Sequence, residues 1–251
     1  MKFGTIPFVN MAPYYHFLSS RWLDEHQVVS GNPRQLGALA KTNKLDAAPF
    51  SYVDGMELVS GGEFEWLDSM GIAGYGPIRS ILLVGAASPK DLAGRSVAVS
   101  PQTATTVRLM EVLLRQKHGI GDFQMAPPED PTPFRLLIGD EALRRKLQQG
   151  GAEPQMDLSE EWTQWTGKPF VFARWAVRKS LPLRDRMRLA VSVRSALELS
   201  LGDLEDVSRA QSERTGLPQA ELMAYLKAIR FNLGPAELAG ADAFAEKLGL
   251  T

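Results

Sequence analysis

The chain has 251 residues, 44% of them hydrophobic, so it is long enough to fold either as one large domain or as two small lobes with packed cores. Its 28 Lys and Arg nearly balance its 29 Asp and Glu, and a net charge of -1 excludes a global field that would attract nucleic acid or a membrane surface. The absence of cysteine excludes disulfides, thiolate metal sites and a cysteine nucleophile. His16, His26 and His118 are scattered, so no metal site is expected.

The amino-terminal stretch does not look like a secretory signal. It has one lysine and then a strand-like run that Pro7, Asn10 and Pro13 interrupt, where a signal would have a long apolar core. The protein is therefore expected to stay in the cytoplasm. The most apolar internal run, residues 81–87, is much shorter than the roughly twenty residues of a membrane-spanning helix, so no membrane segment is expected.

Short apolar runs alternate with helical patterns through the first two thirds of the chain, which is typical of βαβ units and a largely parallel sheet. Residues 3–9 predict a strand, and a helix is expected to begin near Met11. Asn32 followed by Pro33 predicts another helix start, with an N-cap and then proline at the first helical position. That helix leads into a strand at residues 47–50.

A continuous apolar strand is predicted from Ile78 to Val84, and the turn residues after Ala86 indicate a lobe boundary. A second βαβ series follows, and after Lys179 the pattern changes to helices only. The predicted strands of this series are 96–100, 134–138 and 170–177, its helices are 103–117 and one from Asp140, and the helical tail contains 183–201, 218–229 and 235–248.

The expected fold class is therefore α/β with two lobes. The first lobe is predicted to contain residues 1–86 and 177–251, with the helical tail packed on it, and the second lobe residues 87–176. A chain that leaves one lobe and comes back makes two crossings, and such a pair is expected to act as a hinge around a ligand cleft.

A threonine-rich segment lies between a predicted strand end and a predicted helix start. Thr103, Ala104, Thr105 and Thr106 there would bring backbone N–H groups and hydroxyls together at the positive end of the helix dipole. Two interpretations stay open, a site for a substrate carboxylate and an ordinary hydroxyl N-cap.

Arg79 and Ser80 place a cation and a hydroxyl in a strand that is otherwise apolar. Burying such groups is unfavourable unless they are paired or face a cleft. They therefore indicate either ligand contacts or a structural ion pair with a hydrogen-bonded core serine. Alternation along the predicted strand points the two side chains to opposite faces, so both need not line the same site.

Other polar residues follow predicted strands, where ligands of open α/β folds collect. Asn10 follows the first strand and Ser51 the strand at 47–50, and each could contact a ligand or cap a helix. Gly139, Asp140 and Glu141 follow the strand at 134–138, where an acidic pair at a helix start serves capping more often than acid–base chemistry.

Five aromatic residues gather late in the second series and are expected to pack between a lobe and the crossing strand; they are Trp162, Trp165, Phe170, Phe172 and Trp175. The chain has no nucleophile elbow, Walker loop, dinucleotide fingerprint or metal motif. No cofactor is therefore expected.

An ordered set of segments carries a family resemblance from the first strand to about Arg178. The set resembles the chorismate dehydratases of the futalosine route to menaquinone, whose fold is similar to type II periplasmic binding proteins. The segments are Asn10 with Pro13, PFSYVD at 49–54, GPIRSILL at 76–83, TATTV at 103–107, LIGDEAL at 137–143, DLSEEW at 157–162 and GKPFVFARWAVR at 167–178.

The resemblance implies elimination of water from chorismate to give 3-[(1-carboxyvinyl)oxy]benzoate, a lyase reaction without metal or organic cofactor. It points to Asn10 and Ser80 as the catalytic pair. Because no His, Lys or Glu stands out in the matched segments, the enolpyruvyl carboxylate of the substrate is the expected base. The implied substrate-binding residues are Thr103, Ala104, Thr105, Thr106, Ser51, Arg79, Gly139 and Asp140. Arg174 departs from the family pattern, which more often has a small or apolar residue there.

Two other functions stay open. A sister family of the same fold and pathway acts on cyclic dehypoxanthinyl futalosine, but it typically relies on a histidine in the second lobe, where this chain has only His118. The chain could also be a non-catalytic protein that binds a carboxylate. The expected partner is a small molecule, chorismate, with neither nucleic acid nor membrane, and the sequence indicates no oligomeric state.

Overall fold

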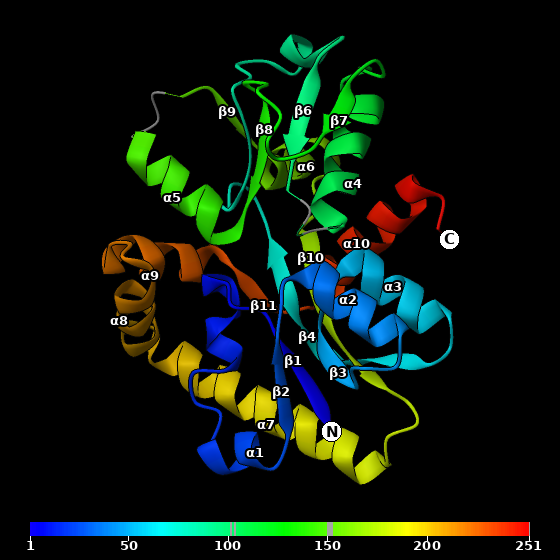
Figure 1. The fold of residues 1–251 in the computed structure, drawn as a ribbon, viewed down its shortest axis with the longest axis vertical. Helices are drawn as coiled ribbons and strands as arrows, with labels where there is room; N and C mark the ends of the chain where they lie inside the picture. Colours follow the sequence, from blue (N-terminus) through cyan, green and yellow to red (C-terminus); the bar gives the residue numbers. More distant parts are fainter. Residues whose placement is uncertain (101, 103, 150–152, 251) are drawn as a thin grey trace. The chain divides into compact units, whose positions relative to one another are not determined.

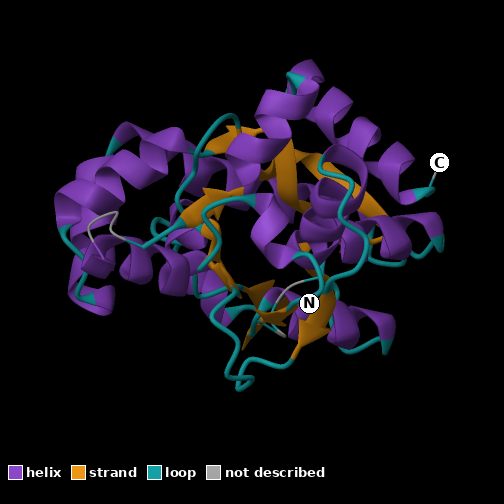
Figure 2. Cartoon of the chain, turned by 90° about the horizontal axis from the view of Figure 1, so that it is seen from above, coloured by secondary structure: helices purple, strands orange, loops and turns teal. Residues whose placement is uncertain are grey.

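The computed structural model describes residues 1–100, 102, 104–149 and 153–250. The chain divides into two compact units, unit 1 with residues 1–72 and 172–233, and unit 2 with residues 73–171 and 234–251. Each unit contains one β-sheet, and helices flank the strands (Figures 1 and 2). None of the helices among the described residues combines the length and hydropathy that crossing a bilayer requires.

The sheet of unit 1 has the strand order β11-β4-β10-β3-β1-β2. Strand β1 pairs in parallel with β2 and β3, whereas β10 runs antiparallel to β3. The carboxyl ends of β1 and β3 therefore lie at the same edge of this sheet. The strands are β1 (Lys2–Thr5), β2 (Gln27–Ser30), β3 (Ala47–Ser51), β4 (Phe64–Gly74), β10 (Phe170–Arg178) and β11 (Arg230–Asn232).

Helix α2 begins where the Asn32–Pro33 pair predicts. Asn32 Oδ1 accepts a hydrogen bond from the backbone N–H of Gln35 at 2.9 Å, and Gln35 Oε1 accepts one from the N–H of Asn32 at 2.9 Å, so a capping box fixes this end. The helices of unit 1 are the 3-10 helix η1 (Val9–Tyr14), α1 (Ser20–Asp24), α2 (Pro33–Lys41), α3 (Tyr52–Ser60), α7 (Leu183–Gly202), α8 (Leu204–Thr215) and α9 (Gln219–Ala228).

The core of unit 1 centres on Trp175 of β10. Its ring stacks on Phe3 of β1 at 5.5 Å and meets Tyr14 of η1 edge-on at 5.5 Å. The buried hydroxyl of Tyr14 donates a hydrogen bond to the carbonyl oxygen of Gly71 at 2.7 Å. These contacts hold η1, the helix that follows β1, against the sheet.

The sheet of unit 2 has the order β7-β6-β8-β5-β9. Strand β6 pairs in parallel with β7 and β8, whereas β5 runs antiparallel to both β8 and β9. The carboxyl ends of β6, β8 and β9 and the amino end of β5 therefore share one edge. The strands are β5 (Ile81–Val84), β6 (Ser96–Val99), β7 (Gln124–Ala126), β8 (Arg135–Ile138) and β9 (Gln155–Asp157).

The core of unit 2 contains Trp162, whose ring meets those of Phe170 and Phe244 at 5.4 and 5.7 Å. Phe244 belongs to α10, so the last helix of the chain packs in this unit. The helices of unit 2 are the 3-10 helix η2 (Pro89–Leu92), α4 (Thr105–Val112), the π-helical turn η3 (Leu113–Lys117), α5 (Gly139–Gln149), α6 (Leu158–Thr166) and α10 (Pro235–Leu248).

The unit borders differ from the predicted lobe borders at 86/87 and 176/177. They fall at 72/73 and 171/172, because β5 pairs with β8 and β9 and so belongs to the sheet of unit 2. Helix α10 groups with unit 2, whereas the whole helical tail was expected on the first lobe. The expected aromatic cluster is also divided, since Trp175 packs in unit 1 and Trp162 in unit 2.

The predicted strand at 78–84 is shorter than expected. Only residues 81–84 are extended in the sheet, because the backbone N–H groups of Ile78 and Arg79 donate to the carboxylate of Asp157 and not to a neighbouring strand. Arg79 also has a φ of 63°, in the left-handed region. The argument from strand alternation for opposite faces of Arg79 and Ser80 therefore does not apply.

Candidate functional site

Three helices of unit 2 begin at the edge where β6, β8 and β9 end. Helix α4 follows β6, α5 follows β8 directly, and α6 follows β9 directly. The first turn of a helix leaves backbone N–H groups without helical partners and carries positive partial charge. Asp157 already caps α6, and α5 and α6 both have acidic residues in their first turns, whereas α4 has neither an acidic first turn nor a side-chain cap. At this edge it is therefore the start of α4 that favours an anionic ligand.

Two of the predicted carboxylate-binding threonines form the start of α4. Thr105 and Thr106 are its first two residues and are buried, with exposed fractions of 1% and 5%. Ala104 precedes them as the N-cap residue, so its side chain supplies no capping oxygen. Thr103 lies outside the described residues.

Ser80 lies at this same edge, directly before β5. The side chain is buried, and the Ser80 carbonyl oxygen accepts a hydrogen bond from the backbone N–H of Gly139 at 2.8 Å. Gly139 and Asp140 are the first two residues of α5. The structure therefore brings Ser80, Gly139 and Asp140 together within unit 2.

Asp157 holds the turn that carries Arg79 and Ser80, and the sequence predictions did not include it. Its Oδ2 accepts hydrogen bonds from the N–H groups of Ile78 at 3.0 Å and Arg79 at 2.6 Å. Its Oδ1 accepts from the N–H groups of Ser159 at 3.0 Å and Glu160 at 3.3 Å, which caps α6. An aspartate directly before the helical pattern SEEW is a recognisable N-cap signal, but the long-range bonds of its second oxygen have no sequence signature.

Burial raises the pKa of Asp157 from its ordinary 3.8 to about 6, while the four backbone donors act in the opposite direction. The cause is that a carboxylate loses hydration when it is enclosed in protein. The side chain is a carboxylate above this pH and accepts all four backbone bonds in that form.

The predicted residues of unit 1 lie at the edge where β1 and β3 end. Asn10 belongs to η1, and its Oδ1 is buried with no hydrogen-bond partner among the described residues. A buried acceptor of this kind is costly unless a ligand or water satisfies it. The structure therefore favours a ligand-binding role for Asn10 over the role of a helix cap.

Ser51 has an interaction inside the protein. Its buried hydroxyl donates to Asp54 Oδ2 at 2.7 Å, and the same carboxylate pairs with Lys41 at 3.2 Å. The serine ends β3 and precedes α3, where its side chain makes no capping bond. Its oxygen lone pairs can still accept a hydrogen bond from a ligand while its hydroxyl proton is donated to Asp54.

Arg174 of β10 lies over an aromatic ring of the same unit. Its guanidinium carbon is 4.3 Å from the ring centroid of Trp66, a cation–π contact. Among the described residues, no three His, Asp or Glu side chains come close enough together to hold a metal ion.

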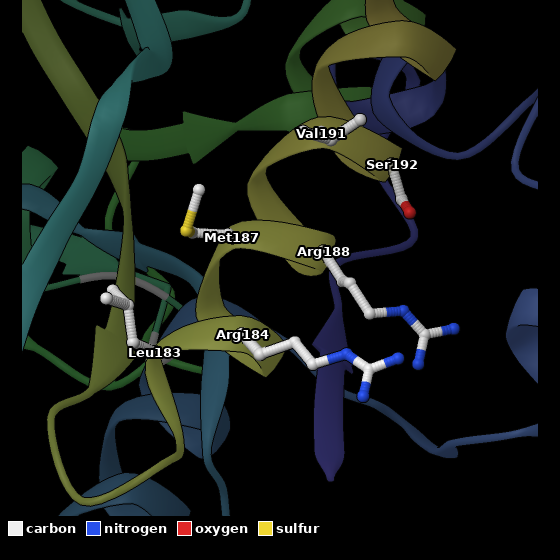
Figure 3. A pocket seen from close by; sticks show the side chains of 6 residues that line it. All are labelled: Leu183, Arg184, Met187, Arg188, Val191 and Ser192. Carbon is white, nitrogen blue, oxygen red and sulfur yellow. The ribbon is translucent and has the colours of Figure 1, made fainter.

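Two surface hollows of unit 1 are distinct from the predicted site residues. One runs along α7 and is lined by Leu183, Met187 and Val191 together with two arginines (Figure 3). The other lies beside η1, where His16 Nε2 is 2.6 Å from Asp206 Oδ2.

The comparisons with known proteins agree over nearly the whole length. A family model described as menaquinone biosynthesis matches residues 1–249. A chorismate dehydratase of Thermus thermophilus is 29% identical over 275 residues, which cover 98% of this chain and 94% of that protein.

Solved structures show the fold. A protein from Archaeoglobus fulgidus has a TM-score of 0.76 at 16% identity, with 100% of this chain and 98% of that chain covered. The alkanesulfonate-binding protein SsuA of Xanthomonas axonopodis pv. citri has a TM-score of 0.67 at 14% identity, covering 100% and 94%. A Candida albicans protein described as having the generic periplasmic binding protein fold scores 0.65 at 11% identity, covering 100% and 90%. The predicted fold class, α/β and similar to periplasmic binding proteins, is confirmed.

Proposed function

Because the chain belongs to the menaquinone biosynthesis family that its sequence matches from residue 1 to 249, we propose that it is a chorismate dehydratase. The observation that carries this proposal is the similarity to the Thermus thermophilus chorismate dehydratase over 98% of the chain. The start of α4 and the buried Ser80 at one edge of unit 2 support it, because chorismate has two carboxylates and a helix start without a side-chain cap can bind one of them.

The proposed reaction removes one water molecule from chorismate. A ring C–H bond breaks, its electrons enter the conjugated ring and its carboxylate, and the neighbouring C–O bond then breaks with loss of hydroxide. The proton and the hydroxide together make water, and the ring becomes the aromatic ring of 3-[(1-carboxyvinyl)oxy]benzoate. Because negative charge builds up on the ring carboxylate before the hydroxyl leaves, donors directed at that carboxylate lower the barrier.

In this proposal, the start of α4 binds one substrate carboxylate. Thr103, Ala104, Thr105 and Thr106 supply hydroxyls and N–H groups next to the positive end of the helix dipole. Further substrate-binding roles are assigned to Ser51, Arg79, Gly139 and Asp140. In the proposed lyase reaction these residues act only through hydrogen bonds and charge.

The proposed catalytic residues are Asn10 of unit 1 and Ser80 of unit 2. Asn10 brings a buried side-chain oxygen that has no hydrogen-bond donor in the part of the chain that the structure describes, and its amide can both donate and accept. Ser80 brings a hydroxyl. Its carbonyl oxygen accepts a hydrogen bond from the N–H of Gly139, and the N–H of the preceding Arg79 donates to Asp157. Asn10 and Ser80 position the substrate and assist departure of the hydroxyl, while the enolpyruvyl carboxylate of chorismate takes the ring proton.

The test is incubation of the purified protein with chorismate, followed by chromatography of the products. Accumulation of 3-[(1-carboxyvinyl)oxy]benzoate supports the proposal. Binding of chorismate without conversion identifies a carboxylate-binding protein. Conversion of cyclic dehypoxanthinyl futalosine in place of chorismate identifies the sister enzyme.

Two variants test the assigned residues. Asn10→Ala and Ser80→Ala should each lower kcat by about 100-fold, the effect of losing one hydrogen-bond donor that acts in the transition state. Ser60→Ala, at an exposed position at the end of α3, is the control and should keep the parent rate. Circular dichroism shows whether each variant is folded, and full turnover in a folded variant removes that residue from the mechanism.

A further inference from the structure

The turn before β5 is tied to α6 by three backbone hydrogen bonds within unit 2. Asp157 Oδ2 accepts from the N–H groups of Ile78 and Arg79 at 3.0 and 2.6 Å. Thr163 Oγ1, one and a half turns further along α6, accepts from the N–H of Gly76 at 2.9 Å. Helix α6 and its N-cap residue therefore act as a scaffold that holds the backbone of three residues that lead into Ser80.

Helix capping alone does not explain an aspartate at position 157. One side-chain oxygen is enough to cap α6, and serine caps helices about as well as aspartate. Asp157 is only 8% exposed, and burying a carboxylate is unfavourable unless its second oxygen is also satisfied. The second oxygen of Asp157 serves a segment 78 and 79 residues away in sequence, which holds Arg79 in a left-handed conformation that arginine rarely adopts.

We propose that Asp157 is a positioning residue for Ser80, with one carboxylate oxygen capping α6 and the other fixing the turn that presents the serine at the edge of the sheet. This inference rests on the proposed function for its catalytic part. A displacement of a reacting group by about 1 Å can lower a rate by about 100-fold, so a turn held by two hydrogen bonds to one oxygen matters for the reaction.

The variant Asp157→Ser separates the capping of α6 from the support of the turn. Asp157→Ser keeps one oxygen for the cap and removes the oxygen that holds the turn, whereas Asp157→Ala removes both. We expect Asp157→Ser to lower kcat for chorismate by about 10-fold to 100-fold, with a smaller change in KM and an unfolding temperature near that of the parent. Asp157→Ala should show the same fall in kcat and, in addition, a lower unfolding temperature than the parent, because the cap is also lost.

A double-variant cycle with Ser80→Ala shows whether Asp157 acts through the serine. In the Ser80→Ala background, Asp157→Ser should have almost no further effect on kcat, because the group it positions is gone. An equal loss of kcat in both backgrounds would overturn the positioning role. If Asp157→Ser leaves the parent kcat unchanged, the proposal also fails.

Hydrogen exchange tests the structural half without any substrate. In Asp157→Ser the amide protons of Ile78 and Arg79 should exchange faster, while those of Ser159 and Glu160 stay protected. This result would support the scaffold even if the protein converts no chorismate, so failure of the proposed function and failure of the scaffold are distinguishable. Unchanged exchange at Ile78 and Arg79 would overturn the scaffold.

Discussion

At the scale of single residues, Asp157 makes a prediction about pH. Burial raises its folded-state pKa from 3.8 to about 6, so the folded protein binds more protons than the unfolded chain between these values. The contribution of this group to the free energy of unfolding is therefore fully present below about pH 4 and is lost as the pH rises to about 6, by up to about 3 kcal/mol. In Asp157→Asn this pH dependence should disappear, as urea unfolding at pH 4 and pH 7 would show.

Glu153 gives a control of opposite sign. Its hydrogen bonds to Arg145 lower its pKa below the ordinary value, so this carboxylate contributes stability that is lost as the pH falls. The parent protein should therefore gain stability relative to Glu153→Gln as the pH rises. The account of Asp157 is wrong if the unfolding curves of the parent and Asp157→Asn keep a constant separation across this pH range.

Sequence patterns predicted candidate residues but not the hydrogen bonds that hold them in place. Asn10 and Ser51 were expected after strands, and η1 and α3 begin at these points. Ser80 was expected inside a strand, yet it lies in a turn, because the carboxylate of Asp157 takes the N–H groups that a ladder would use. The hydrogen bond from Arg79 to Asp157 joins residues 78 positions apart and depends on how the sheet is assembled. Local periodicity in the sequence cannot predict such a bond.

At the scale of elements, α10 depends on one glycine. A Cβ at Gly240 would stand 2.0 Å from the carbonyl oxygen of Pro169, closer than atoms can approach. Although alanine usually stabilises a helix interior, we expect Gly240→Ala to lower the free energy of unfolding by about 1–3 kcal/mol, because α10 and the segment just before β10 must move apart.

Gly202 at the end of α7 is the matched control. A Cβ there meets no atom within 4 Å, so Gly202→Ala should leave stability unchanged or raise it by up to about 1 kcal/mol. Chemical denaturation of both variants checks the pair. A Gly240→Ala protein as stable as Gly202→Ala would show that α10 does not need the close approach to Pro169.

The elements themselves were predictable where signals were local. The capping box at Asn32 and Pro33 placed the start of α2 correctly, and the helix at 235–248 was expected with its observed bounds. Strand β4 was missed, since it contains charged residues and Asp68 adopts a φ of 57°, which interrupts the alternation expected of a strand. Pairing with other strands of unit 1 stabilises β4, and this pairing leaves no local pattern in the sequence.

At the scale of the whole molecule, the order of elements was enough to predict the α/β class and a chain that passes between two lobes more than once. It was not enough to predict which unit contains the last helix. The helical tail reads as one amphipathic series, and nothing in its composition separates α10 from α9. The separation comes from tertiary packing: Phe244 of α10 meets Trp162 and Phe170 in unit 2, at 5.7 and 4.8 Å.

Two separate aromatic cores predict that the units can be loosened one at a time. Phe244→Ala should lower the free energy of unfolding by about 3–5 kcal/mol, because the buried ring leaves a cavity beside Trp162. Hydrogen exchange in native conditions should then speed up at amides of α4, α6 and β6, while amides of β1 and β3 change less. Phe64→Ala, which removes a buried ring next to Phe50 in unit 1, should produce the reverse pattern. If both variants accelerate exchange equally throughout the chain, the two cores unfold as one cooperative unit and the expected independence is wrong.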